Sequence, residues 1–384
     1  MSEWKKVKLG ELCKNVTSGG TPKSSIASYY DPPTIPWLKT KEVNYNRIYE
    51  TESHISDEGL RNSSAKLIPS NSIIVAMYGQ GDTAGRVAIN KIPVTTNQAC
   101  CNLTIDENKA NYEFVYYNLC TLYDKLVSLK NGGAQPNLNA GIIKNLEICI
   151  PPLATQHRIA TILSRYDSLI ENYQKQIKLL EEAAQRLYKE WFIDLHFPGH
   201  ENTNITDGVP EGWEKKKVGE IAEFKRGKTI TKKDIVEGNV PVVAGGLEPA
   251  YYCNKHNTAG RVITISGSGA NAGFTRLYYE KVWASDCSFA DTNTTKWLHF
   301  VYCFLQASKS AIDNMQKGAA QPHVYAKDIN ALDIIVPEAE LLSGFEDLAS
   351  TYFNKVQSLQ SQLRLLTEAR DRLLPKLMSG EIEV

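Results

Sequence analysis

A heptad pattern near the middle of the chain constrains the fold more than any other feature. Stepping from Ile159 alternately by four and three residues gives ten positions, all apolar or aromatic. These seam positions are Ile159, Leu163, Tyr166, Ile170, Tyr173, Ile177, Leu180, Ala184, Leu187 and Trp191. An apolar stripe with this period predicts a helix that packs along a partner helix. No glycine or proline interrupts residues 155–191, so one helix is predicted there, roughly 55 Å long at about 1.5 Å per residue.

The partner helix is predicted from the same chain. Adding 186 to each seam position gives a second set in which only one residue, Arg370, is not apolar. The second set is Phe345, Ala349, Tyr352, Val356, Leu359, Leu363, Leu366, Arg370, Leu373 and Leu377. Two such narrow stripes are expected to bury each other. The alternative, two unrelated surface helices of a globular core, does not account for the shared offset.

The regions before each helix are also related. Residues 4–12 are similar to residues 213–221, and residues 74–85 are similar to residues 262–273. The offset is 209 at the first of these matches, 188 at the second and 186 at the helices, so the second globular region is 23 residues shorter. The chain is therefore predicted to be a duplication, in which each globular domain is followed by a helix.

The predicted fold class is α+β, with two duplicated small α/β domains separated by two long helices. Apolar runs at 72–76 and 262–266 predict strands, and residues 112–129 and 297–314 predict helices. Each domain is therefore expected to be a small α/β unit with a mixed or antiparallel sheet. A pseudo-two-fold axis would make the long helices antiparallel and place one globular domain at each end of the pair. The predicted boundaries are 1–150 for the first domain, 151–196 for the central helix, 197–211 for a linker, 212–337 for the second domain and 338–384 for the C-terminal helix.

Composition favours a cytoplasmic protein. No apolar run approaches the roughly 18 residues of a membrane span, and Met1 begins no signal peptide, so no membrane partner is expected. The eight cysteines lack metal-ligand spacing and are predicted to be buried, reduced thiols.

Charge is distributed unevenly although the net charge is zero. Residues 1–150 and 211–337 carry net charges of +2 and +3, whereas 151–210 and 338–384 carry −2 and −3. Basic globular domains favour an anionic partner such as nucleic acid.

Glycine-rich turns and a basic cluster provide the candidate DNA contacts. The turns at 78–85 and 267–273 follow predicted strands without the crossover helix of a dinucleotide site, so they are either simple tight turns or loops that approach DNA. Residues 215–233 include eight lysines and arginines, which form either a solvated face or phosphate contacts. The candidate DNA-binding residues are Thr21, Lys23, Gln80, Thr83, Lys225, Arg226, Lys228, Thr229, Ser268 and Asn271.

No catalytic, cofactor-binding or metal-binding residues are predicted. Residues 222–229 match a relaxed phosphate-loop pattern, but the residues between its ends are bulky and charged. Residues 31–34 read Asp-Pro-Pro-Thr and lack the aromatic residue of an amino-group methyltransferase motif. His196 and His200 flank a Pro-Gly turn and not one helix face, and no nucleophile with a base and an orienting group is evident.

Over essentially its whole length the chain resembles the specificity subunits of type I restriction–modification systems. Three segments carry the resemblance: Gly133-Ala134-Gln135-Pro136-Asn137, the run from Ile150 to Ile159, and Trp191-Phe192-Ile193-Asp194 with Phe197-Pro198-Gly199. Thr155 stands where the family usually has a glutamate at the entry to the helix. The resemblance implies target recognition domains that each read one half of a bipartite, asymmetric site on double-stranded DNA. It also implies that the paired helices set the spacer and dock the methyltransferase subunits.

The resemblance implies no chemistry in this chain. Two methyltransferase (M) subunits would use S-adenosylmethionine, and restriction (R) subunits would use ATP and Mg²⁺, so this chain needs no cofactor. Two alternatives remain open, namely an autonomous DNA methyltransferase and a coiled-coil scaffold that does not bind DNA. Failure to bind S-adenosylmethionine alone would exclude the first, and a salt-dependent mobility shift with the methyltransferase partner would exclude the second.

Overall fold

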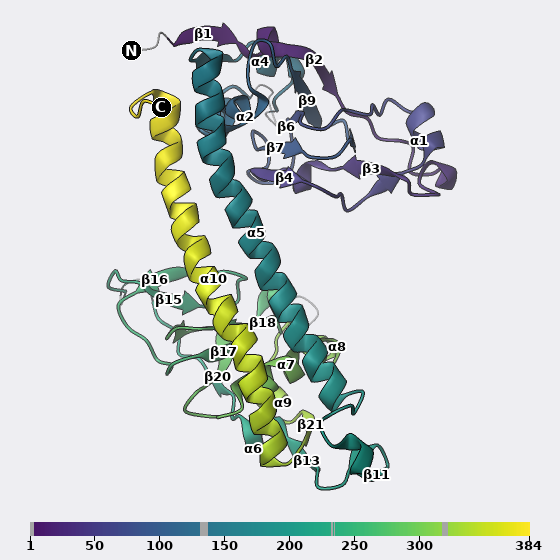
Figure 1. Cartoon of the computed structure of the whole chain (residues 1–384), viewed down its shortest axis with the longest axis vertical. Coiled ribbons are helices and arrows are strands. Elements are labelled where there is room, and N and C mark those ends of the chain that lie inside the picture. Colours follow the sequence, from purple (N-terminus) through teal and green to yellow (C-terminus); the bar gives the residue numbers. More distant parts are fainter. Residues whose placement is uncertain (1–3, 131–136, 232, 234, 317–321) are drawn as a thin grey trace. The chain divides into compact units, whose positions relative to one another are not determined.

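The chain divides into two compact units in a computed structural model (Figure 1). Unit 1 comprises residues 1–171 and 365–384, and unit 2 comprises residues 172–364. The residues described are 4–130, 137–231, 233, 235–316 and 322–384. Each unit contains a globular domain together with parts of two long helices, α5 (Leu153–Phe192) and α10 (Ala339–Ser379). We call the globular part of unit 1 domain 1 and that of unit 2 domain 2.

The first residues of α5 explain where this helix starts. The Pro152 carbonyl accepts hydrogen bonds from the backbone N–H groups of Thr155 and Gln156 (2.9 and 3.1 Å). The Gln156 side chain donates to the Pro151 carbonyl (2.9 Å) and accepts from the Asn111 N–H (3.0 Å), so it fixes the helix start to domain 1. The other long helix, α10, ends before Gly380, whose φ of 74° is the left-handed conformation that commonly terminates a helix.

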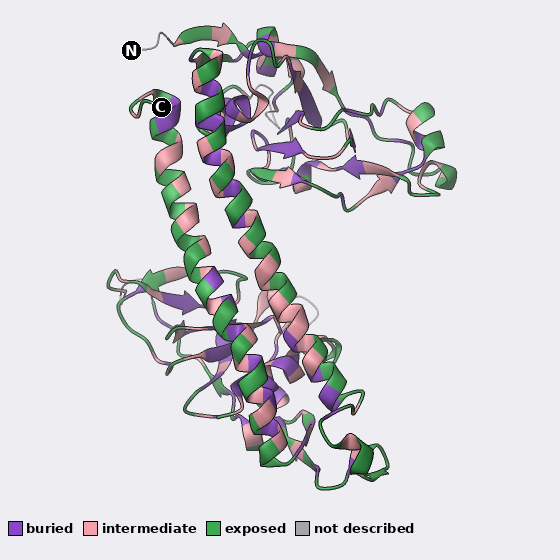
Figure 2. Ribbon diagram, viewed as in Figure 1, coloured by how far each residue is buried: buried purple, intermediate pink, exposed green. Residues whose placement is uncertain are grey.

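The burial pattern along α5 and α10 follows the heptads (Figure 2). None of the twenty predicted seam positions is exposed, and Ile159, Leu163, Ile170, Phe345, Val356 and Leu377 are among those that are buried. Arg370, the charged exception, donates to Asp167 Oδ1 at 2.8 Å. An ion pair therefore replaces an apolar contact at this level of the seam.

The two helices are antiparallel within each unit. In unit 1, Ile159 and Leu163 near the start of α5 share a core with Leu377 near the end of α10. In unit 2, the Trp191 ring near the end of α5 lies 6.0 Å from the Phe345 ring near the start of α10. The predicted antiparallel arrangement and α+β class are confirmed.

Both domains are built on the same central sheet. In domain 1 the order is β2-β9-β6-β7-β4, and in domain 2 it is β14-β20-β17-β18. The strands of domain 1 are β2 (Cys13–Ser18), β9 (Cys100–Ile105), β6 (Ile73–Ala76), β7 (Val87–Asn90) and β4 (Asn46–Ile48). Those of domain 2 are β14 (Lys225–Arg226), β20 (Cys287–Asp291), β17 (Val262–Ser266) and β18 (Thr275–Tyr278). Among the described residues, only domain 1 has a fifth strand in this sheet, β4, which runs parallel to β7.

Smaller sheets repeat in register. Strand β1 (Lys5–Lys8) pairs with β10 (Glu147–Ile150), and β13 (Glu214–Lys217) pairs with β21 (Asp333–Val336), at corresponding residues throughout. The third sheets, β5-β3-β8 and β16-β15-β19, also have the same order and the same mixture of antiparallel and parallel pairs. Their strands are β3 (Ile35–Leu38), β5 (His54–Ile55), β8 (Thr95–Thr96), β15 (Val240–Val243), β16 (Tyr251–Cys253) and β19 (Trp283–Ala284). The duplication is thus present at the level of strand pairing.

Two predicted helices are each broken in the structure. The helix predicted over 112–129 forms α2 (Tyr112–Cys120) and α3 (Tyr123–Ser128), because the Thr121 hydroxyl donates back to the Asn118 carbonyl (2.8 Å) and ends α2. The helix predicted over 297–314 forms α7 (Leu298–Ala307) and α8 (Lys309–Asn314), with a non-helical ψ of 13° at Ser308. After each break a turn of helix buries one aliphatic side chain, Leu126 in domain 1 and Ile312 in domain 2.

The predicted linker and cysteines also differ in part from expectation. Residues 197–211 include two buried residues, Phe197 and Pro210, and the Phe197 ring lies 4.9 Å from that of Trp213 and anchors the segment on domain 2. Five of the eight cysteines are buried, but Cys149 is exposed because its side chain alternates outward along β10. Burial raises the pKa of the half-buried Cys13 to about 11, so this thiol is protonated at neutral pH.

Candidate nucleic-acid interface

The candidate loops of domain 1 leave the central sheet at the same end. Strands β2 and β6 flank β9 and are both antiparallel to it. Ser18 at the end of β2 pairs with Cys101, and Ala76 at the end of β6 pairs with Cys100. The loop with Thr21 and Lys23 and the glycine turn after β6 therefore start side by side.

Domain 2 repeats this arrangement. Arg226 at the end of β14 pairs with Ser288, and Ser266 at the end of β17 pairs with the adjacent Cys287. The loop with Lys228 and the turn that follows β17 consequently leave domain 2's sheet together. Topology thus brings the ten candidate residues into two clusters, one in each domain.

A close backbone approach fixes the first loop in each domain. A Cβ atom on Gly19 would lie 2.2 Å from the Asn97 carbonyl oxygen, and one on Gly227 would lie 2.4 Å from that of Ser285. Only glycine fits these positions without movement of the backbone. The first loop therefore lies against the residue that follows β8 in domain 1 and β19 in domain 2. These are the strands that pair in parallel with β3 and β15.

Tryptophans hold the next residue of these loops. The Trp37 indole N–H donates to the Gly20 carbonyl (3.1 Å), and the Trp283 indole N–H donates to the Lys228 carbonyl (2.7 Å). The two tryptophans occupy different strands, β3 and β19, yet they bond to equivalent loop positions. Both loops are thus held at their base while the residues beyond remain available.

Three of the four domain 1 candidates are exposed. Thr21, Lys23 and Gln80 are exposed, whereas Thr83 is half-buried. The Thr83 hydroxyl donates to the Gln80 carbonyl (2.7 Å), so it stabilises the glycine turn. The Thr21 hydroxyl donates to the side-chain carbonyl of Gln98. In this cluster Lys23 and the Gln80 side chain are the groups best placed to meet a nucleic acid.

The domain 2 cluster contains exposed basic side chains and engaged polar ones. Lys225, Arg226, Lys228 and Thr229 are exposed. Lys225 pairs with Glu223 at 3.4 Å and, as the neighbour of Arg226 on a strand, points to the opposite face of the sheet. Ser268 donates to Asp286, and the Asn271 amide donates to the Gly245 carbonyl at 3.4 Å, so both shape the turn.

A small cavity of about 80 Å³ is lined by the candidate residue Arg226 and by residues that were not predicted from the sequence, His323 and Tyr325. Ser268 also lines it, and the imidazole of His323 stacks on the Tyr325 ring at 5.9 Å. Tyr325 is 40% exposed and lies beneath the Lys327 ammonium (5.8 Å). Aromatic rings beside cations suit contacts with nucleic acid bases and phosphates. The dipeptide Gln321-Pro322, which repeats Gln135-Pro136 at the offset of 186 and precedes His323, was the available sequence signal.

Some predicted features lie outside the described residues. These are Lys232 of the basic cluster and the motif segments 133–136 and 319–321. In the parts of the chain that are described, no group of three or more His, Cys, Asp or Glu side chains could hold a metal ion. No helix of the described residues has the length and hydropathy needed to cross a membrane.

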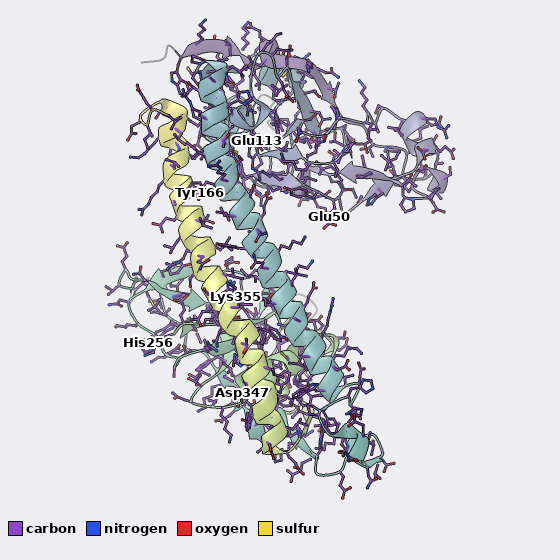
Figure 3. All side chains as sticks on the ribbon, viewed as in Figure 1. Glu50, Glu113, Tyr166, His256, Asp347 and Lys355 are labelled. Atoms are coloured by element: carbon purple, nitrogen blue, oxygen red, sulfur yellow. The ribbon has the colours of Figure 1, made fainter. Side chains whose placement is uncertain are left out.

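Arg47 connects domain 1 to the long helix α5. Its guanidinium donates to the Ser168 hydroxyl (3.0 Å) and lies 3.7 Å from the Glu171 carboxylate. Within the domain the same group lies 3.6 Å from Glu113, which is labelled in Figure 3, and 3.4 Å from the Tyr117 hydroxyl. The Arg47 side chain is only 5% exposed. It is therefore a buried cation among acidic partners.

The electrostatics of this cluster are those of a shared ionic network. Burial by itself lowers the pKa of Arg47, but the surrounding Tyr117, Glu171 and Asp167 outweigh it, so the pKa is raised and the cation is retained. The Tyr117 hydroxyl donates to Asp167 (2.5 Å), and burial together with that carboxylate raises the pKa of Tyr117. Since Asp167 also pairs with Arg370, the network reaches both long helices within unit 1.

Arg261 has the corresponding position in unit 2. Its guanidinium donates to the side-chain oxygens of Asn354 and Gln357 on α10, the latter at 3.1 Å. It also lies 3.3 Å from His299 Nε2. His299 Nδ1 lies 2.7 Å from the Glu346 carboxylate, so Nδ1 donates there and Nε2 accepts from Arg261. Adding 186 to Ser168 and Glu171 gives Asn354 and Gln357, so the two arginines meet equivalent helix positions.

The arginines themselves come from different places in the duplicated fold. Arg47 belongs to β4, the fifth strand of domain 1, which has no counterpart in the described part of domain 2. Arg261 instead precedes β17 of the central sheet. Its helix partners are neutral amides, whereas Arg47 faces carboxylates. Each domain therefore contacts the long helices through an arginine, but the two arginines come from different parts of the fold and have partners of different charge.

Comparison with known proteins assigns the family. Residues 1–182 and 210–341, which contain the two globular domains and most of α5, match the model of the type I restriction modification DNA specificity domain. The chain therefore belongs to this family of DNA specificity subunits. It is 30% identical over 424 residues to the type I restriction enzyme MjaIX specificity subunit of Methanocaldococcus jannaschii, with 100% of this chain and 97% of the relative covered.

Further relatives agree in length and fold. The type I restriction enzyme HindI specificity subunit of Haemophilus influenzae is 22% identical over 477 residues, with 100% of both chains covered. The crystal structure of a type I restriction-modification S subunit from M. genitalium superposes with a TM-score of 0.67 at 20% identity, covering 98% of this chain and 96% of that one. That structural likeness establishes the fold.

Proposed function

We propose that each globular domain of this chain reads one half of a bipartite, asymmetric DNA site for a type I restriction–modification complex. The paired helices set the spacer between the half-sites and dock two methyltransferase subunits, with restriction subunits joining in the full complex. The chain itself carries no catalytic step and needs no cofactor, because S-adenosylmethionine, ATP and Mg²⁺ are used by the partner subunits. The cytoplasm is the expected compartment.

One observation carries this proposal: equivalent loops cluster at one end of two sheets that share strand order but differ in side chains. Domain 1 presents Thr21, Lys23 and Gln80, whereas domain 2 presents Arg226, Lys228 and Thr229 at related positions. Base-edge recognition depends on the donors and acceptors that reach the groove. Two scaffolds of one design with different loops are therefore suited to two different half-sites.

Mapping methylated adenines in a genome that expresses the chain with its methyltransferase subunit tests the proposal. We expect a split site with unlike halves. Transplanting residues 19–23 and 79–85 from another family member should change one half only. Methylation by this chain in the absence of the methyltransferase subunit, or S-adenosylmethionine binding by the chain alone, would support the autonomous methyltransferase instead. An absence of any salt-dependent DNA mobility shift with the methyltransferase present would support the scaffold.

We expect the basic residues at β14 to contribute phosphate contacts in domain 2. Replacing Lys225, Arg226 and Lys228 together by Ala should weaken binding at every DNA sequence and reduce the salt dependence by roughly one unit for each lost contact. Since Lys225 points to the opposite face, the single Lys225→Ala variant shows whether that lysine belongs to the interface. Wild-type affinity and salt slope in the triple variant would show that the cluster is only a solvated face.

The helix seam is expected to organise the complex. Replacing Ile170 and Ile177 together by Asp puts two charges into a seam in which Ile170 is buried and Ile177 half-buried, and such burial costs several kcal/mol, on the order of 2–7 for each unpaired polar group. Co-purification with the methyltransferase subunit should be lost. Leu169→Asp with Leu179→Asp is the matched control, because both leucines are exposed. An intact complex from the seam variant would contradict this role.

A further inference from the structure

The free edge of domain 2's sheet lies where domain 1 has its fifth strand. In domain 1, β4 covers the edge strand β7, with Asn46, Arg47 and Ile48 opposite Ala88, Ile89 and Asn90. In domain 2 the equivalent edge strand is β18, which is last in its sheet. The place that β4 fills in one copy of the fold is thus open in the other.

A groove occupies this open place in domain 2. Its volume is about 830 Å³, and residues 276–280 of the β18 edge form its floor. One wall is the face of α10 with Gln357, Gln360, Ser361 and Arg364, and the other is formed by residues around β15 and β16. All of these residues belong to unit 2. The groove therefore borders the edge of β18 with which an added strand would pair.

The direction of the peptide groups on β18 supports this interpretation. The Thr275 carbonyl accepts from the Gln306 side chain (3.1 Å) and the Tyr279 carbonyl from the Gln357 side chain (3.4 Å), so both face away from β17. By the alternation of an antiparallel ladder, the peptide groups of Leu277 face the same way. In the described parts of the chain, no hydrogen-bond partner completes the Leu277 N–H and C=O.

Domain 1 shows how a strand satisfies these groups. The Val87 carbonyl accepts from the Tyr45 N–H (2.8 Å), and the Lys91 N–H donates to the Ile48 carbonyl (2.7 Å). Adding 188 to Val87 and Lys91 gives Thr275 and Tyr279, the two positions that glutamine side chains serve in domain 2. Glutamine side chains therefore bond to the two carbonyls at the ends of the β18 edge. The Leu277 N–H and C=O at its centre remain available for hydrogen bonds to another chain.

We infer that this groove binds an extended segment of the methyltransferase subunit by adding a strand to β18. The inference rests on the proposed function, which supplies this partner. Strand addition obtains affinity from main-chain hydrogen bonds and specificity from side-chain pockets. Glu248 is paired with Arg276 at 3.2 Å, so the other charged residues of the lining are Glu237, Glu280 and Arg364, with a net charge of −1, and the segment should carry a basic residue. A strand of about the length of β4 is sufficient.

Hydrogen exchange on the full-length chain tests the inference. Three samples are compared: the chain alone, the chain with purified methyltransferase subunit, and the chain with DNA of the cognate site. In each, mass spectrometry measures hydrogen exchange in the peptide that covers residues 274–280. We expect this peptide to gain protection on addition of the methyltransferase subunit. The internal control is the peptide covering residues 86–92, which β4 already protects and which should not change.

A groove-filling variant provides a second readout. Ser361→Trp places a bulky ring in the groove from the helix wall without altering β18, and it should weaken binding of the methyltransferase subunit about tenfold through loss of a few hydrogen bonds. Ser358→Trp is the matched control, because Ser358 is exposed on the same helix and does not line the groove. Wild-type affinity in the Ser361→Trp variant would overturn the inference.

The outcomes separate this inference from the proposed function. A complex that forms without added protection at residues 274–280 overturns the groove's role and leaves the function standing. Protection that DNA alone produces assigns the edge to nucleic acid, and protection that depends on the concentration of the free chain assigns it to a second copy. Both results also overturn the inference. Failure of any complex to form counts against the proposed function itself.

Discussion

Inserting four residues after Ile177 and four after Leu363 should lengthen the spacer of the methylated site by one or two base pairs and leave both half-sites unchanged. Each insertion adds about 6 Å of helix at about 1.5 Å per residue. At about 3.4 Å per base pair this is somewhat less than two base pairs. Four residues added to a heptad pattern are accommodated by local unwinding of the supercoil. The measurement is the methylated site, mapped in a genome that expresses the variant complex.

The antiparallel pairing within each unit explains why both insertions are needed. Asp167 pairs with Arg370 in unit 1, and Trp191 packs on Phe345 in unit 2, so positions on α5 and α10 add to nearly the same number in both units. With both insertions, the four new residues of each helix face four native residues of the other. The native pairing then resumes on either side. An insertion in one helix alone would instead shift one seam against the other.

The matched control lengthens the chain without lengthening a helix. Four residues inserted after Asp207 fall in the turn between β11 (Ile205–Thr206) and β12 (Val209–Pro210), where Gly208 has φ of 76° and open space around it. The spacer should not change in this variant. If the variant with insertions in both α5 and α10 keeps the wild-type spacer, or if its half-site bases change, the helices do not set the spacer. The heptads would then serve only to pack the two helices together.

The parts of the fold that could be predicted are those encoded by local or repeated pattern. The heptads gave α5 and α10 because their period is a property of neighbouring residues, and the offset of 186 identified the partner helix. The strand at 262–266 was predicted at its observed bounds. The broken helices were missed because the interruptions depend on one hydroxyl at Thr121 and one dihedral angle at Ser308, which periodicity does not report.

The arginines that join each domain to the helices could not be predicted from the sequence. Arg47 and Ser168 are 121 residues apart, and Arg261 and Gln357 are 96 apart. Comparison of the two sequence repeats identified the paired helices. It could not identify the two arginines, because they occupy non-equivalent positions in the repeats. The DNA-binding candidates depend on loop conformation in the same way, and they remain predictions.

Replacing these arginines by methionine should have unequal effects on stability. Arg47→Met removes a buried cation from Glu171 and from Glu113, which keeps only Lys91 at 3.4 Å, and loss of one partner of a buried ion pair costs about 3 kcal/mol. Arg261→Met removes hydrogen bonds to neutral groups and should cost about 1–2 kcal/mol. Arg372→Met is the control, since its ion pair is exposed and contributes about 0–1 kcal/mol. Urea unfolding measures all three, and equal losses at Arg47 and Arg372 would contradict the buried network.

A second readout separates positioning from stability. If Arg47 and Arg261 fix how each domain is held on the helices, their loss should let the complex methylate sites whose spacer is one base pair too long or too short. General destabilisation lowers methylation of every site in proportion and does not change the preference among spacers. Since the contacts of both arginines lie at equivalent helix positions, both variants should relax the spacer, although only Arg47→Met is strongly destabilising. Unchanged spacer preference in Arg261→Met, a folded variant, would show that its helix contacts serve stability alone.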